Sequence, residues 1–200
     1  YDYNGSKATP EAPYALTIGK TGTALYQTDA APLSRLPSTG NRITGNALVD
    51  STDLEAARLR LTQMTNSRGK RINIPISSTI LLVPEALAPV AQTILGSQQT
   101  PGVFGEQNPW GPQGSYRPRL LSSSKLDALS TTAWHLGDFK RQFRRKWSIR
   151  METVSLSGDI TNYLRNRIAY EVRVGWDCET AAVDYVYVVQ CLSGTTTPGD

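Results

Sequence analysis

The sequence has little of the residue types that carry catalysis or bind metals. Its 200 residues include two cysteines and one histidine. Two cysteines without a CxxC spacing exclude a disulfide framework and a cysteine-rich zinc site. The sequence also lacks a run of roughly 18 apolar residues for a membrane span and a basic start followed by an apolar signal region. We therefore expect a soluble, non-secreted protein without a membrane partner. The start at Tyr1 indicates a processed product or a portion of a longer polypeptide.

What is present is the composition of a globular protein. Hydrophobic residues make up 39% of the chain and charged residues 19%, which is enough for one sizeable core. The net charge of +4 predicts only a mild attraction to polyanions.

We interpret Cys178 and Cys191 as reduced core residues. Residues 167–176 and 185–191 both alternate between apolar and polar positions, which favours a hairpin. In that hairpin Cys178 lies beside the turn and Cys191 near the far end, too far apart for a disulfide.

Residues 1–50 are rich in Gly, Pro, Thr, Ser and Ala and have no sustained helical or strand period. This composition predicts an arm or extended loop region that contributes no core. The remainder, residues 51–200, is predicted to form the folded core.

The first helix is predicted over residues 52–66. Thr52 and Glu55 have the spacing of a capping box, in which each side chain accepts a hydrogen bond from the other residue's backbone. Apolar residues follow at helical spacing, and Gly69 is expected to end the helix.

The stretch at 77–97, SSTILLVPEALAPVAQTILGS, predicts a buried strand joined directly to a short helix. Residues 80–83 form the strand, and Pro84 suits the first helical position, where the missing N–H has no partner in any case. Pro89 predicts a short or kinked helix, which closes at Gly96.

Residues 97–118 hold four glycines and four prolines and are predicted to form a long loop. Its three aromatic residues, Phe104, Trp110 and Tyr116, lie in a segment too rich in Gly and Pro to bury them alone. We therefore expect them to contact a neighbouring subunit.

From residue 119 onward the chain turns to alternating, strand-like patterns, most clearly at 147–152 and 167–176. Residues 184–189, DYVYVV, are apolar or aromatic on both faces and predict a central strand. Helices early and long strands late predict an α+β fold.

Candidate catalytic and metal-binding residues are few. His135 would have to serve any Ser-His-Asp or Cys-His site, but its apolar, strand-like context favours a partly buried structural histidine. Asp177, Glu179 and Asp184 could converge on a hard cation, yet we favour solvated residues flanking a hairpin turn. No Gly-rich phosphate loop or nucleophile elbow occurs. We expect no enzyme activity, no cofactor and no metal.

The marked charge feature is KRQFRRKWSIR at 140–150, which carries basic residues and no acid. With its two interleaved aromatics it could contact phosphates and stack bases. A solvated basic edge, or a surface that pairs with acids on a neighbouring subunit, remains open. The candidate DNA-facing or inter-subunit residues are Lys140, Arg141, Arg144, Arg145, Lys146 and Arg150.

An ordered series of motifs resembles the major capsid proteins of tailed phages, of the Hong Kong 97 type and notably the Mu-like head subunits. The series runs from the helix STDLEAARLRLTQMTN through GKRINIPISSTILLVPEALAPVAQTILGS to NPWG and LDALSTTAWHLGD. It covers roughly residues 45–192. In that family a strand of this type passes into a helix, a variable loop and a further strand containing tryptophan.

The resemblance implies a capsid subunit with peripheral and axial domains and extended arms. Such a subunit would assemble with copies of itself, as pentamers and hexamers, into the icosahedral head of a tailed bacteriophage that encloses double-stranded DNA. Partners would be the packaged DNA, bound non-specifically, and portal, scaffold or decoration proteins. Assembly would take place in the bacterial host cytoplasm, and the final location would be the virion capsid.

Two other functions stay open. A nucleic-acid-binding module would rely on residues 140–150, and an encapsulin-type compartment shell shares the fold but encloses enzymes. The family's long spine helix finds no match in residues 1–50.

Overall fold

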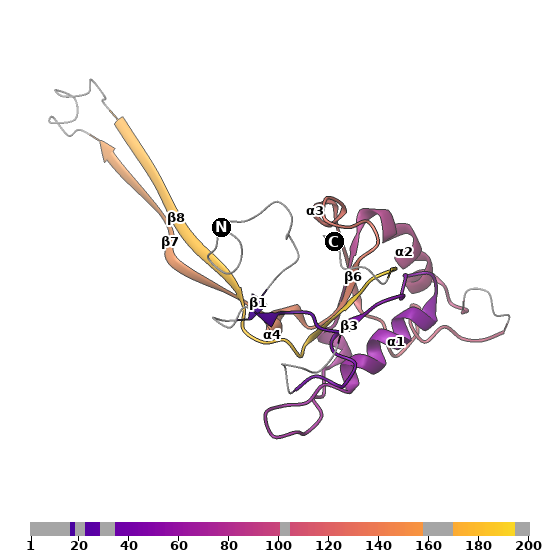
Figure 1. The fold of residues 1–200 in the computed structure, drawn as a ribbon. Helices are drawn as coiled ribbons and strands as arrows, with labels where there is room; N and C mark the ends of the chain where they lie inside the picture. The colour runs from indigo at the N-terminus through magenta and orange to yellow at the C-terminus, as the bar shows by residue number, and fades with distance from the viewer. Residues whose placement is uncertain (1–16, 19–22, 29–34, 101–104, 158–169, 195–200) are drawn as a thin grey trace. The chain divides into compact units, whose positions relative to one another are not determined.

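The computed structural model describes residues 17–18, 23–28, 35–100, 105–157 and 170–194, drawn in colour in Figure 1. Of residues 17–18, 23–24, 146–157 and 170–179 it describes the backbone alone. The chain divides into two compact units, residues 1–143 with 182–200 and residues 144–181, which we describe separately. No helix among the described residues is long and apolar enough to cross a membrane.

The first unit is built on a five-stranded sheet with the order β3-β9-β6-β4-β5 (Figure 1). The central strand, β6, is antiparallel to both of its neighbours, while the two outer pairs, β3 with β9 and β4 with β5, are parallel. The strands are β3 (Arg42–Ile43), β4 (Ile80–Pro84), β5 (Arg119–Ser123), β6 (Trp134–Gly137) and β9 (Val188–Cys191). Together with the helices this is an α+β fold, as the sequence predicted.

Two helices cover one face of this sheet. α1 contacts β9 and β6, and α2 contacts β4 and β5. The helical segments of the described chain are α1 (Ser51–Thr62), α2 (Ala88–Gly96), α3 (Ser124–Asp127), α4 (Phe139–Gln142) and the 3-10 turns η2 (Ile76–Ser78) and η3 (Glu85–Leu87).

The core lies between these helices and the sheet. Leu81, Leu136 and Val189 lie side by side on β4, β6 and β9, and all three are buried. The Trp134 ring is fully buried beside them, and its indole N–H donates a hydrogen bond to the Asn46 carbonyl, 3.0 Å away. Each buried aliphatic side chain contributes about 1.5–3 kcal/mol, so this row is a main source of the stability of the sheet.

The helix predicted at 52–66 is shorter and is capped by other residues. α1 begins at Ser51, and its N-cap is Asp50, whose carboxylate accepts a hydrogen bond from the Thr52 backbone N–H at 2.7 Å. Asp53 completes the capping box, so the predicted pair Thr52 and Glu55 was wrong. Asp50 lies directly before the helix in extended conformation and supplies a charged acceptor for the first turn, whereas the Thr52 hydroxyl lies two residues later, inside the helix.

The end of α1 is set by contacts with distant segments. The helix ends at Thr62, and the Thr65 backbone N–H already donates to the Arg35 carbonyl at 3.0 Å. Gly69 therefore does not end the helix as predicted. It lies in the following turn with a φ of 72°, a left-handed conformation that glycine adopts without strain.

The strand-to-helix junction is confirmed, but its two prolines have other positions than predicted. Pro84 is the last residue of β4 and remains extended, and the 3-10 turn η3 follows before α2 begins. Pro89 lies in the first turn of α2, where its missing N–H costs nothing. The Asp127 carboxylate accepts hydrogen bonds from the backbone N–H groups of Glu85 and Ala86, both at 3.2 Å, and so fixes the turn between strand and helix.

The expectation that residues 1–50 contribute no core was wrong. Leu36 and Leu48 are buried in the main core, and Leu25 and Tyr26 form a second buried cluster with Val188. The two residues of β3 also extend the sheet beside β9. A short strand pair, β1 (Thr17–Ile18) with β2 (Thr23–Ala24), precedes them. These segments are too short to show a period in the sequence, which is why composition alone suggested an arm.

The second unit consists of two long strands, β7 (Phe143–Ser157) and β8 (Tyr170–Ala182), which pair with each other. The predicted hairpin between 167–176 and 185–191 was therefore wrong: β8 pairs with β7, whereas β9 joins the five-stranded sheet. The strand predicted at 184–189 is interior, as expected, but begins only at Val188.

The two cysteines do not lie on one hairpin as predicted, because Cys178 is on β8 and Cys191 is on β9. Cys191 is free and buried, as expected, and burial raises the pKa of its thiol. The side chain of Cys178 lies outside the described residues.

The second face of the sheet carries a polar row across three strands. Arg42 Nε donates to Gln190 Oε1 at 2.9 Å, and Gln190 Nε2 lies 3.3 Å from His135 Nε2. The side-chain nitrogen of Gln190 can only donate a hydrogen bond, so His135 Nε2 is the acceptor and the imidazole is neutral. The partly buried structural histidine predicted from the sequence is confirmed. Burial, reinforced by the positive charge of Arg42, lowers the pKa of His135 to about 4.

We expect His135 to make the fold sensitive to mild acid. An unfolded histidine binds a proton near pH 6.5, whereas folded His135 does so only near pH 4. Between these values the unfolded state binds more protons, so stability falls as the pH falls, by on the order of 3 kcal/mol in total. Urea unfolding at pH 7.0 and 4.5 should show a larger loss for the wild type than for His135→Gln. Equal losses in both proteins would contradict this assignment.

Candidate functional site

The predicted basic stretch is divided between the two units. Lys140 and Arg141 lie on α4, whereas Arg144 and Arg145 are exposed at the start of β7. Arg141 already makes structural contacts: its Nε lies 3.4 Å from Asp138 Oδ2, and its guanidinium lies 5.8 Å from the centre of the Tyr187 ring. Lys146 and Arg150 belong to β7, but their side chains lie outside the described residues.

The sequence did not predict a role for Gln142. This residue lies directly before β7 and bonds to the segment that follows β8. It is fully buried. Its backbone carbonyl accepts from the Val183 N–H at 2.9 Å, and its side-chain Oε1 accepts from the Tyr187 N–H at 3.1 Å. Its side-chain nitrogen lies 3.4 Å from the Tyr26 hydroxyl. One glutamine thus connects three segments that are distant in sequence.

An ion pair lies beside this junction. Arg35 pairs with Asp184, and its guanidinium lies 4.8 Å from the centre of the Tyr185 ring. Asp184 therefore serves a salt bridge. Asp177 and Glu179 lie within β8, so the prediction that they flank a hairpin turn was wrong for these two. Among the residues that the structure describes, no three metal-binding side chains cluster.

The loop predicted at 97–118 is confirmed, since its described residues form no strand or helix beyond the isolated bridge between Gln99 and Gln107. Asn108 organises it: its side-chain nitrogen donates to the carbonyls of Ile94 and Ser97, at 2.6 and 3.1 Å, and its Oδ1 accepts from the Trp110 N–H. Asn108 thereby caps the end of α2. The signal for it in the sequence was the Asn-Pro turn in NPWG.

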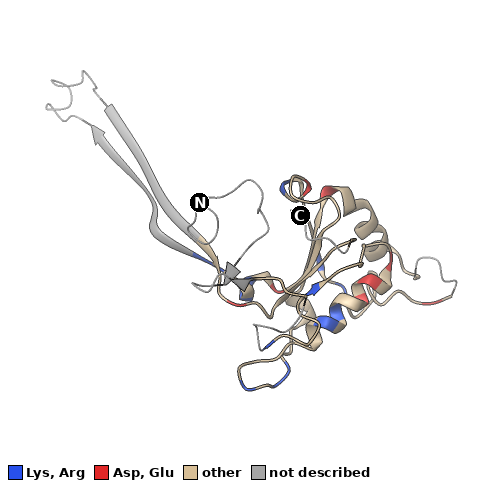
Figure 2. Cartoon of the chain, in the orientation of Figure 1, with Lys and Arg blue, Asp and Glu red and all other residues tan. Residues whose placement is uncertain are grey.

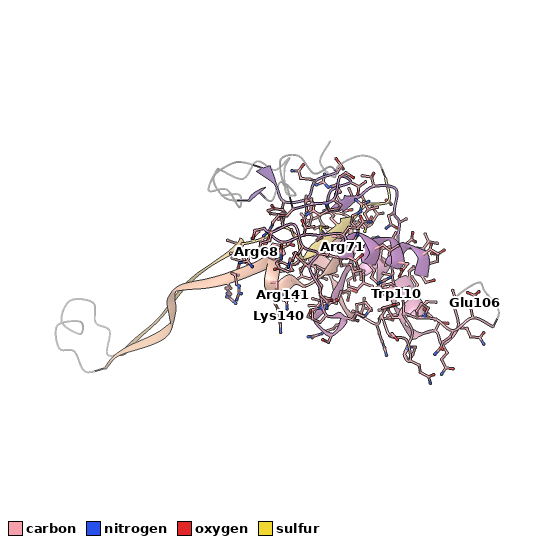
Figure 3. All side chains as sticks on the ribbon, turned by 90° about the horizontal axis from the view of Figure 1, so that it is seen from below. Arg68, Arg71, Glu106, Trp110, Lys140 and Arg141 are labelled. Carbon is pink, nitrogen blue, oxygen red and sulfur yellow. The ribbon has the colours of Figure 1, made fainter. Side chains whose placement is uncertain are left out.

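This cap directs Trp110 into the core of its own chain, where 3% of its surface is exposed. Figure 3 shows Trp110 within the body of the molecule and Glu106 out along the loop. The expectation that Trp110 needs a neighbouring subunit was therefore wrong. Tyr116 remains partly exposed, with its ring centre 5.9 Å from that of Trp110. Phe104 lies outside the described residues.

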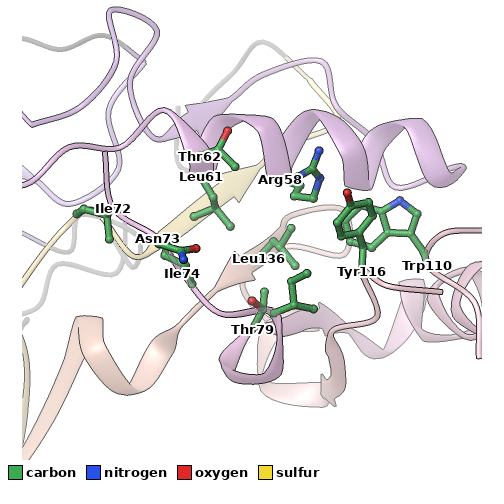
Figure 4. Close-up of a pocket in the computed structure, with 11 residues that line it drawn as sticks. Arg58, Leu61, Thr62, Ile72, Asn73, Ile74, Thr79, Trp110, Tyr116 and Leu136 are labelled. Carbon is green, nitrogen blue, oxygen red and sulfur yellow. The ribbon is translucent and has the colours of Figure 1, made fainter. Parts of the chain in front are cut away.

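Behind these rings an apolar cavity of about 170 Å³ opens to the surface (Figure 4). We call it the α1 groove. Leu61 and Leu136 line it from α1 and β6, and the Arg58 guanidinium lies 4.4 Å from the centre of the Tyr116 ring at its edge. The remaining lining residues are Thr62, Ile72, Asn73, Ile74, Ile76, Thr79, Trp110 and Tyr116. The groove thus reaches from the surface to the central strand of the sheet.

The polar side chains described above cap helices, close turns and join segments.

Comparison with known proteins defines the family. A family model described as phage capsid protein matches residues 8–189, so the chain belongs to this family of phage capsid proteins. The family is structural and non-enzymatic, and membership places the protein in a virion capsid built from many copies of its subunit. No curated protein matches the chain.

We expect Gln142→Ala to destabilise the first unit by about 2–4 kcal/mol, because it leaves the partly buried Tyr187 N–H without its partner and creates a cavity at a fully buried site. Urea unfolding followed by circular dichroism measures this change. The matched control is Gln92→Ala on the exposed surface of α2, which should change stability by less than about 0.5 kcal/mol. Equal effects of the two substitutions would show that Gln142 is not a structural link.

Proposed function

We propose that this protein is the major capsid subunit of a tailed bacteriophage, of the Hong Kong 97 type and similar to the Mu-like head subunits. In this proposal its copies form pentamers and hexamers that close into an icosahedral head around double-stranded DNA. The family match over residues 8–189 carries the proposal, and the order of the motifs from 52 to 138 supports the narrower assignment.

The physical character of the chain supports this role. A shell needs a subunit with a rigid body, since each of its modest contacts is repeated many times by symmetry. The strand-to-helix junction at Pro84, fixed by Asp127, provides such rigidity without a catalytic group. We propose that the peripheral and axial domains lie within residues 51–200, and that residues 1–50 include an arm in addition to their buried segments.

Further partners belong to the same proposal. The basic residues of 140–150 would face either packaged DNA, bound non-specifically, or an acidic surface of a neighbouring subunit. The loop at 97–118 would lie at a contact within the capsomer. Portal, scaffold or decoration proteins would bind the shell, and assembly would take place in the bacterial host cytoplasm.

The direct test is particle formation by the complete gene product. Light scattering and negative-stain microscopy should find hollow polyhedral shells or rings of subunits. A protein that stays monomeric at all concentrations would contradict the proposal. Shells that enclose a protein cargo in place of nucleic acid would favour the encapsulin-type alternative.

The second candidate, a nucleic-acid-binding module, is favoured by the exposure of Arg144 and Arg145. Fluorescence anisotropy with single-stranded DNA over a range of salt concentrations tests it. Each phosphate contact adds about 0.7 to the slope of log affinity against log salt. Arg144→Ala should lower that slope by about 0.7, whereas Arg117→Ala, at an exposed arginine outside the stretch, should leave it unchanged. Equal slopes for all three proteins would remove the basic stretch as a DNA contact.

A further inference from the structure

The α1 groove has the size of one apolar side chain. Its volume is about 170 Å³, and an apolar protein cavity of about 150 Å³ accommodates a benzene ring. Ile76, on the outer part of its lining, has 36% of its surface exposed. A leucine or a phenylalanine from another molecule would fit this space and cover Ile76.

The backbone beside the groove is also available for contact. Residues 72–75 belong to no helix or strand, Pro75 has extended dihedral angles, and Ile72 donates its N–H to the Met64 carbonyl at 2.9 Å. Among the described residues, the N–H groups of Asn73 and Ile74 have no hydrogen-bond partner. Unpaired groups on an extended segment can bind the backbone of a partner.

The chain continues from a strongly basic turn into the groove. Arg68, Lys70 and Arg71 are exposed in the turn that leads to Ile72, and no acidic residue lies between positions 66 and 76. Figure 2 shows this turn in blue, and Figure 3 labels Arg68 and Arg71. The matching surface is therefore an exposed apolar side chain next to acidic groups.

The chain itself carries such a surface at the end of β4 and β5. Leu129, just after α3, has 40% of its surface exposed. The carboxylates of Glu85 and Asp127 lie in the same region, because Asp127 on α3 accepts from the Glu85 backbone. Lys125 lies on the same short helix, so the region has two acidic groups and one basic group, and the Glu85 carboxylate also accepts from the Ser122 hydroxyl at 2.9 Å. Figure 1 places α3 and the basic turn at opposite ends of the first unit.

We propose that the α1 groove docks a second copy of this chain, which inserts Leu129 while its Glu85 and Asp127 face the basic turn. The proposal rests on the proposed function, in which many copies assemble. Because the two surfaces differ and lie at opposite ends, each copy binds the next head to tail. Such a heterologous contact generates closed rings when the rotation between copies fits, as a capsomer requires.

Cysteine cross-linking tests the contact in the assembled, complete gene product. A chain carrying both Ile76→Cys and Leu129→Cys should form a ladder of covalent dimers and larger species on mild oxidation. Either single variant can form no 76–129 bond, so these variants also control for Cys178 and Cys191. If the wild-type protein forms particles but the double variant gives no ladder, the proposed contact is overturned while the proposed function stands.

Substitutions at the same residues provide a quantitative test. Ile76→Ser and Leu129→Ser should each raise the concentration needed for assembly about tenfold or more, whereas Val49→Ser, at a site with 70% exposure, should not.

A charge swap tests the polar part of the contact. Arg71→Glu and Glu85→Arg should each weaken assembly, and the double variant should recover most of it, because the swap restores the opposite charges. If all variants assembled at the same protein concentration as the wild type, the proposed contact between Leu129 and the α1 groove would be overturned. A wild-type protein that never assembles would overturn the proposed function and the contact with it.

Discussion

The structure depends on the pairing of β6 with β4 on one side and β9 on the other. This pairing places Leu136 between Leu81 and Val189 and brings Trp134 beside Cys191. It joins segments that are more than 50 residues apart in either direction, so the sheet cannot form from local interactions alone. The helices α1 and α2 then have one continuous apolar surface to cover. Every candidate surface described for the first unit is positioned by this arrangement.

The polar groups of the described chain mainly serve this arrangement. Asp127 fixes the junction between β4 and α2, Asn108 caps α2 and directs Trp110 inward, and Gln142 joins three segments beside the second unit. Their hydrogen bonds pair backbone groups at a turn, at a helix end and between distant segments. Polar contacts that fix turns and helix ends suit a capsid protein, whose subunit must keep its shape through many repeated contacts.

The sequence predicted best where the signal was local. The strand at 80–83 with its following helix, the long loop and the strand around His135 were all recognised from apolar runs and turn residues. Prediction failed where distant contacts decide the structure. The end of α1 depends on a hydrogen bond to Arg35, and β9 pairs with β6 although its pattern resembled a hairpin partner of β8. Trp110 was expected at an interface because the Asn-Pro pair in NPWG indicates a turn but does not indicate that Asn108 caps α2 and directs the ring into the core. The α1 groove is formed by α1, the 72–79 segment, the loop and β6 together, so its existence could not be predicted from any one motif.

A cryo-electron microscopy reconstruction of the particles formed by the complete gene product tests the central claim most directly. We expect a closed shell with icosahedral symmetry, in which each subunit contains the sheet β3-β9-β6-β4-β5 and its α1 groove is covered by the neighbouring copy. A particle without closed symmetry, or subunits whose density lacks this sheet, would contradict the assignment of the chain as a shell-forming capsid subunit.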